Sequence, residues 1–87
     1  MQMITGTCHC GKNKFKLKGD AEFQFICYCN NCKHINSGGH LCGIMFDKNK
    51  LTAALETSTY IYPGGSGHKI ELHFCGKCAT HLYSWPL

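Results

Sequence analysis

Hydrophobic and polar residues alternate over several short stretches of this 87-residue chain, as expected for β-strands with one face towards solvent. The clearest case is KFKLK, in which three lysines alternate with Phe15 and Leu17. Short strands at this spacing predict an all-β domain of small antiparallel sheets, sandwich-like or barrel-like, with little helix. The strand-like stretches are 14–18, 22–27, 41–46, 58–63, 68–75 and 81–85.

Some stretches carry finer predictions. In 68–75, alternation predicts that Ile70, Leu72 and Phe74 face inwards while Glu71 and His73 face solvent.

The apolar run LCGIMF, at 41–46, predicts a buried central strand, with Cys42 as a buried and inert thiol. The glycine-rich PGGSG at 63–67 predicts a hairpin connection. Helical turns are expected only within CNNCKHIN at 29–36 and NKLTAALE at 49–56.

A chain of this length forms one domain, residues 1–87, with a core too small to be stable without a further staple. Its eight cysteines indicate that staple. The N-terminus has no apolar run typical of a signal peptide, so we expect a cytoplasmic protein in which cysteines bind metal. A secreted disulfide scaffold and an iron–sulfur protein are the alternatives. No apolar stretch approaches the roughly 20 residues of a membrane span.

Two cysteine pairs lie near opposite ends of the chain. Cys8 and Cys10 form a C-x-C pair, and Cys75 and Cys78 form a C-x-x-C pair. Paired thiols distant in sequence are a common way to build a closed, tetrahedral zinc site. We therefore expect this four-cysteine group to hold a structural Zn²⁺.

Cys27, Cys29 and Cys32 form a separate three-cysteine group. Three ligands leave one tetrahedral position free, as in catalytic zinc sites, and a thiol that enters this position is held as a thiolate. The group therefore predicts a second, catalytic Zn²⁺ and chemistry on small thiols. Alternatively, Cys42, His34 or His40 supplies a fourth ligand and both zinc ions are structural, in a non-catalytic module that binds protein or nucleic acid.

The formal charge of +4 does not favour nucleic acid as a partner. Seven thiolates and two Zn²⁺ would lower the net charge to about +1, because metal ligands must be deprotonated. The chain also contains no arginine, which is the preferred residue for reading phosphate and guanine.

Three motifs together resemble the glutathione-dependent formaldehyde-activating enzyme family, which includes centromere protein V. They are Gly6-x-Cys8-x-Cys10-Gly11, Cys27-x-Cys29-x-x-Cys32 and Phe74-Cys75-x-x-Cys78. The resemblance implies zinc-bearing β-sheets, a structural zinc on the four-cysteine group and a catalytic zinc on the three-cysteine group. It also implies carbon–sulfur lyase chemistry, in which glutathione and formaldehyde are in equilibrium with S-hydroxymethylglutathione.

The chain departs from this family at two places. Ala79 replaces a common glycine after the last cysteine, and members usually continue beyond the equivalent of Leu87. We therefore expect the domain to lack the family's C-terminal strands and to expose a sheet edge, through which a homodimer forms.

Substrate contacts are expected close to the three-cysteine group. Lys33 is suited to attract a carboxylate of glutathione. Gly38 and Gly39, in the loop NSGGH, would let a thiol ligand approach the backbone closely.

Overall fold

The computed structural model describes residues 3–53, 56–65 and 67–87. The regular secondary structure of the described residues is mainly antiparallel strand with little helix, which confirms the predicted all-β class. The elements are β1 (Met3–Thr7), β2 (Lys14–Lys18), β3 (Phe23–Cys27), α1 (Asn30–Asn36), β4 (Leu41–Met45), η1 (Lys48–Lys50), β5 (Leu51–Ala53), β6 (Thr57–Pro63), β7 (Lys69–Cys75) and β8 (His81–Pro86).

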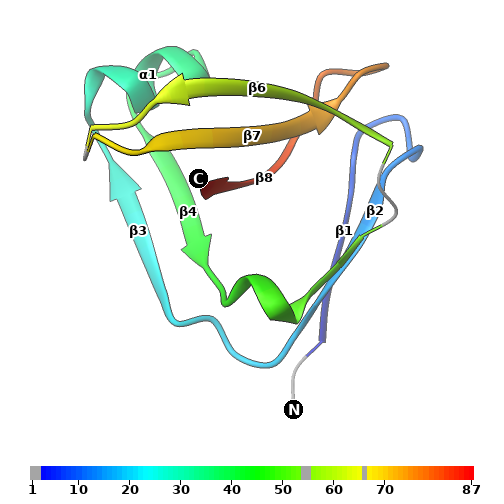
Figure 1. The fold of residues 1–87 in the computed structure, drawn as a ribbon. Helices are drawn as coiled ribbons and strands as arrows, with labels where there is room; N and C mark the ends of the chain where they lie inside the picture. Colours follow the sequence, from blue (N-terminus) through cyan, green and yellow to red (C-terminus); the bar gives the residue numbers. More distant parts are fainter. Residues whose placement is uncertain (1–2, 54–55, 66) are drawn as a thin grey trace.

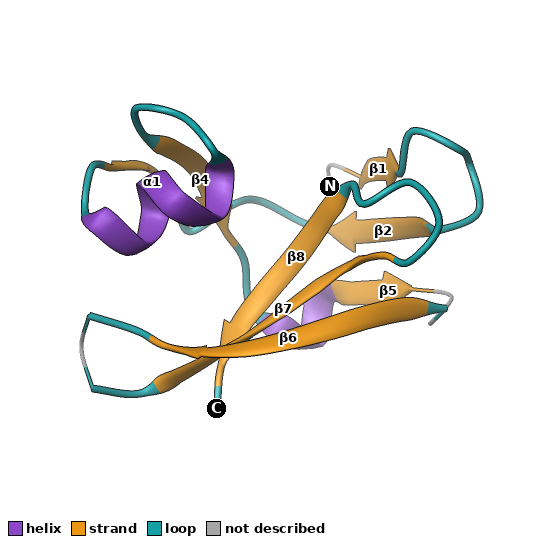
Figure 2. Ribbon diagram, turned by 90° about the horizontal axis from the view of Figure 1, so that it is seen from above, coloured by secondary structure: helices purple, strands orange, loops and turns teal. Residues whose placement is uncertain are grey.

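The strands form three small antiparallel sheets. Sheet A has the order β1-β2-β5, sheet B contains β3 and β4, and sheet C has the order β6-β7-β8. Figure 1 shows the three sheets around a common interior, with α1 beside the C-terminal end of β6. Seen from above in Figure 2, sheet B and α1 lie to one side of sheets A and C.

Sheet C contains the predicted hairpin. β6 and β7 pair over seven residues, from Thr57 opposite Cys75 to Pro63 opposite Lys69. The Gly64 amide donates to the His68 carbonyl at 2.8 Å and closes the connection. Ser66, within the same connection, lies outside the described residues.

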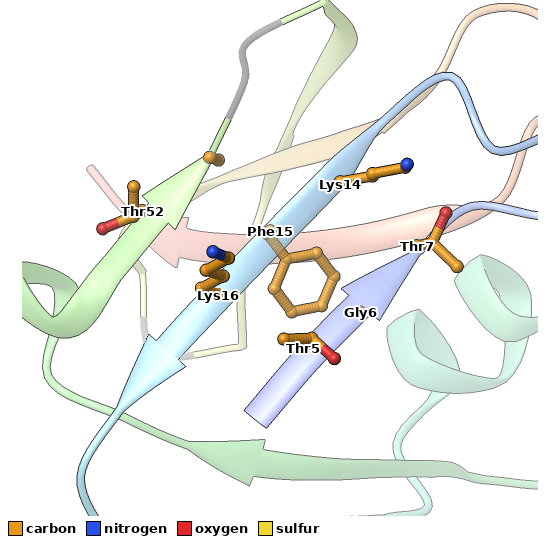
Figure 3. A pocket seen from close by; sticks show the side chains of 8 residues that line it. Thr5, Gly6, Thr7, Lys14, Phe15, Lys16 and Thr52 are labelled. Atoms are coloured by element: carbon orange, nitrogen blue, oxygen red, sulfur yellow. The ribbon is translucent and has the colours of Figure 1, made fainter. Parts of the chain in front are cut away.

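In two of the sheets, a phenylalanine ring covers a glycine on the neighbouring strand. Phe15 pairs with Gly6 in sheet A, and Phe25 pairs with Gly43 in sheet B. A side chain at either glycine would collide with the ring, so the glycine is required by packing. Figure 3 shows the ring of Phe15 beside Gly6, in a shallow pocket that contains no cysteine, histidine or acidic side chain.

Sheet B is more exposed than the sequence predicts. The stretch 41–46 does contain a strand, but the prediction of a buried central strand is wrong, because β4 pairs only with β3 among the described strands. Ile44 is 54% exposed and the Cys42 thiol is exposed, not buried. The homodimer through a sheet edge stays a prediction.

The prediction that His73 on β7 faces solvent is also wrong. His73 is 8% exposed and is enclosed by Tyr83 and Trp85 of β8 at 4.8 and 4.6 Å between ring centroids. Its ring nitrogens lie 2.9 Å from the Thr57 hydroxyl and 2.8 Å from the Glu71 carboxylate. Both faces of this strand are therefore covered, and period-2 alternation cannot identify which polar residues are buried.

The hydrophobic core is very small. Among the described hydrophobic residues, only Cys8, Leu72 and Cys75 are buried. Two of these three belong to the four-cysteine group, so burial is greatest at a candidate metal site.

The helical predictions are partly confirmed. CNNCKHIN contains α1, but NKLTAALE contains only the end of the 3₁₀ turn η1 and then strand β5. Ala54 and Leu55, in the second stretch, lie outside the described residues. Of the helices that the structure describes, none has the length and apolar character needed to cross a membrane.

Candidate metal centres

The fold brings all four sulfurs of the four-cysteine group together. Cys8 follows β1 and Cys75 ends β7, yet the sulfurs of these two residues, Cys10 and Cys78 all lie within 4.8 Å of one another. The Sγ atoms of Cys8 and Cys10 are 3.5 Å apart, and those of Cys10 and Cys75 are 3.7 Å apart. Tetrahedral zinc with thiolate ligands requires about 3.8 Å between sulfurs, because each Zn–S bond is about 2.3 Å.

Backbone amides and one hydroxyl fix this group. The Asn13 amide donates to Cys8 Sγ at 3.3 Å, and the Cys8 amide donates to the Asn13 carbonyl at 3.1 Å. The Thr80 hydroxyl accepts from the His9 amide at 3.0 Å and lies 3.1 Å from Cys78 Sγ, to which it can donate. Thr80 therefore connects the two cysteine pairs.

These hydrogen bonds favour thiolates. Donation from the Thr80 hydroxyl and amide lowers the pKa of Cys78 to about 5. The hydrogen bond from the Asn13 amide lowers the pKa of Cys8. Against a hydrogen bond from the Lys12 amide, burial and the neighbouring thiols raise the pKa of Cys10 to about 11. Metal ligands must be deprotonated, so ionisation of all four thiols requires a compensating cation.

The three-cysteine group lies where β3 meets α1. Cys27 ends β3, Cys29 is the N-cap of α1, and Cys32 lies in its first turn. The Cys29 sulfur accepts from the Cys32 amide at 3.4 Å and lies 3.3 Å from the Cys27 sulfur. All three sulfurs lie within 4.8 Å of one another.

The thiols of the three-cysteine group differ in how easily they lose a proton. The hydrogen bond from the Cys32 amide, with those from the Cys27 and Cys32 thiols, lowers the pKa of Cys29 to about 7. Burial and the two neighbouring thiols raise the pKa of Cys32 to about 12. Without a cation, one thiolate among the three is therefore stable near neutral pH, and full deprotonation requires a compensating positive charge.

Both groups fit a metal ion better than a disulfide. All eight cysteines are free, and the closest sulfur contacts, 3.3 to 3.7 Å, far exceed the bond of about 2.05 Å in a disulfide. Their geometry and donor set make both groups able to hold metal ions.

The proposed fourth ligands do not join the three-cysteine group. Among the described residues, none of His34, His40 and Cys42 has a ligand atom within 4.8 Å of all three sulfurs. Lys33 follows Cys32 directly and is exposed. Gly38 and Gly39 are exposed at the other end of α1.

Comparisons with known proteins agree with the resemblance. The sequence model of the family described as glutathione-dependent formaldehyde-activating enzyme matches residues 3–86. The chain belongs to this family. A protein of Halomonas elongata, named "Putative glutathione-dependent formaldehyde-activating enzyme", is 31% identical over 93 residues, which cover 97% of this chain.

The chain spans 59% of the length of that family member. No solved structure matches the chain.

Family membership gives Ala79 a structural interpretation. Ala79 has φ of +65°, the left-handed region in which glycine is favoured, and its amide donates to the Cys75 carbonyl at 2.8 Å. The tight turn after the last ligand therefore suits the glycine that is common in the family.

Ala79→Gly is expected to raise the free energy of unfolding of the metal-loaded protein by about 0.5–1 kcal/mol, because it relieves left-handed strain. Denaturant titration measures the change. Ala53→Gly, in strand β5, is the matched control and is expected to lower stability by a similar amount. Equal destabilisation by both glycines would contradict this interpretation.

Sequence reasoning missed the residues that support the two groups. Thr80 is two positions from Cys78, so its spacing was a usable signal for a hydroxyl beside a ligand. Asn31, between Cys29 and Cys32, hydrogen-bonds to Pro63 at 2.8 Å. No local pattern predicts that contact, since Asn31 lies in helix α1 and Pro63 ends strand β6, 32 positions further along the chain.

Proposed function

We propose that this chain is a zinc-dependent carbon–sulfur lyase-like protein. It binds a small thiol such as glutathione at the three-cysteine group and catalyses reversible addition of the thiol to an aldehyde, in the manner of S-hydroxymethylglutathione formation. The observation that carries the proposal is the ligand count: three sulfurs converge, and no fourth histidine, cysteine or carboxylate of the described chain joins them.

In this proposal the two groups have different roles. The four-cysteine group is a structural site, because four protein sulfurs complete a tetrahedron. Cys27, Cys29 and Cys32 hold the second Zn²⁺, which when bound supplies Lewis acidity and stabilises an incoming thiol as its thiolate.

The chain's own residues orient the reaction. The Cys32 amide holds the Cys29 sulfur as an acceptor, which fixes the first turn of α1 around the group. The exposed side chain of Lys33 attracts a carboxylate of the thiol substrate. The backbone at Gly38 and Gly39 is a further proposed contact for the thiol ligand. The space beside Gly39 is open, since a Cβ added there would meet no atom within 4 Å.

The overall reaction balances without an oxidant or reductant. The thiol sulfur forms a bond to the carbonyl carbon of formaldehyde, the C=O π bond breaks, and the carbonyl oxygen receives the proton that the thiol loses. The reverse reaction breaks the C–S bond and releases thiol and aldehyde.

Calorimetric titration of the zinc-loaded protein with glutathione tests the proposal. We expect saturable binding of glutathione and none of S-methylglutathione, which has no ionisable thiol. Lys33→Ala is expected to weaken binding by roughly three- to tenfold, as expected for loss of one exposed charge contact, with zinc content unchanged. Absence of saturable glutathione binding by a protein that contains two zinc ions would overturn the proposal.

A further inference from the structure

The β6–β7 hairpin reaches the three-cysteine group from a distant part of the chain. The Asn31 side chain, between two ligands of the group, donates from Nδ2 to the Pro63 carbonyl at 2.8 Å. Figure 1 shows the end of β6 on the same side of the molecule as α1. The residues immediately before Pro63 are therefore held close to the group.

Tyr62 is the aromatic side chain next to this contact. It precedes Pro63 and lies on the same face of β6 as Tyr60, with the two rings stacked at 6.0 Å and 17°. Tyr62 is partly buried, whereas Tyr60 is 55% exposed. Burial, and then the charges of Cys32, Cys29 and Cys27, raise the pKa of Tyr62, so its phenol keeps its proton and can donate a hydrogen bond.

A thiolate bound at this group needs hydrogen-bond donors. Three thiolates and a divalent cation carry a net charge of −1, and a fourth thiolate would make it −2. Residues 27–46 and 57–70 contain neither aspartate nor glutamate, so these two segments hold no carboxylate that would repel the bound thiolate. A phenol that donates to sulfur would stabilise the added charge, and hydrogen bonds to charged acceptors are the stronger kind.

We propose that Tyr62 is a substrate-binding residue whose hydroxyl donates a hydrogen bond to the sulfur of the thiol held at the three-cysteine group. This inference rests on the proposed function and adds to it a residue from sheet C. The Asn31–Pro63 hydrogen bond positions the tyrosine, and the stacked ring of Tyr60 limits its rotation.

The test compares Tyr62→Phe with Tyr60→Phe, which removes the same hydroxyl from the neighbouring, more exposed ring. Dissociation constants of the zinc-loaded proteins are measured for glutathione and for 2-mercaptoethanol. Tyr62→Phe is expected to weaken the binding of both thiols about tenfold or more, because the proposed contact is to the sulfur that both share. Zinc content and melting temperature are expected to stay at wild-type values, and Tyr60→Phe is expected to change neither affinity.

The outcomes separate this inference from the proposed function. If the wild-type protein binds neither thiol, the proposed function fails and this inference fails with it. If the wild type binds both thiols and Tyr62→Phe binds them equally well, only the role of Tyr62 is overturned. Weaker binding of glutathione alone would place the tyrosine against the peptide part of the ligand and would also overturn a contact to sulfur.

Discussion

Removal of bound metal by a strong chelator is expected to unfold the chain. Circular dichroism should lose its β signal, the thermal transition should disappear, and dispersed amide resonances should collapse. Structural zinc in small domains supplies on the order of 10–16 kcal/mol of apparent binding free energy, which exceeds the stability that so small a core provides.

The distribution of burial is the reason for this expectation. Apart from Leu72, the buried hydrophobic residues of the described chain are Cys8 and Cys75, two candidate ligands. Sheet B also exposes large apolar side chains, including Phe23 at 54% and Ile26 at 56%. Packing alone therefore leaves little stability once the sulfurs lose their shared cation.

A reducing agent without chelator is the control. It is expected to leave the fold intact, because the thiols are already free. Addition of Zn²⁺ after chelation should restore the spectrum. Unfolding by reductant and resistance to chelator would contradict the metal interpretation and favour disulfides.

The cysteine spacing predicted correctly which sulfurs meet. Closely spaced pairs of thiols allow few other groupings. Alternation also identifies strands such as KFKLK, in which Phe15 and Leu17 are less exposed than the lysines beside them. Both signals are local in sequence.

The failures came where neighbours distant in sequence decide the environment. His73 is buried because Tyr83 and Trp85 of β8 cover it, and β4 is exposed because the described chain supplies no strand or sheet to bury it. The contact between Asn31 and Pro63 belongs to the same class, since it joins helix α1 to the distant β6–β7 hairpin. Such relations depend on tertiary packing, which a window of one strand does not contain.

Serine substitutions in the two cysteine groups are expected to have opposite consequences. Cys75 is fully buried, at 0% exposure, and its sulfur belongs to the group that ties β7 to the segment after β1. Cys75→Ser should therefore leave the chain largely unfolded, because it breaks the structural site and buries a hydroxyl without a cation. Cys29 is exposed, so Cys29→Ser should keep the fold, bind one zinc ion rather than two, and lose saturable thiol binding.

Elemental analysis and circular dichroism on the same preparations measure the contrast. Cys42→Ser is the matched control, because Cys42 is an exposed thiol outside both groups, and it should retain two zinc ions, the fold and thiol binding. If Cys29→Ser unfolded as completely as Cys75→Ser, the three-cysteine group would be a structural site and the lyase proposal would lose its basis. A folded Cys29→Ser protein without thiol affinity would instead show that the four-cysteine group stabilises the fold and that the three-cysteine group binds the substrate.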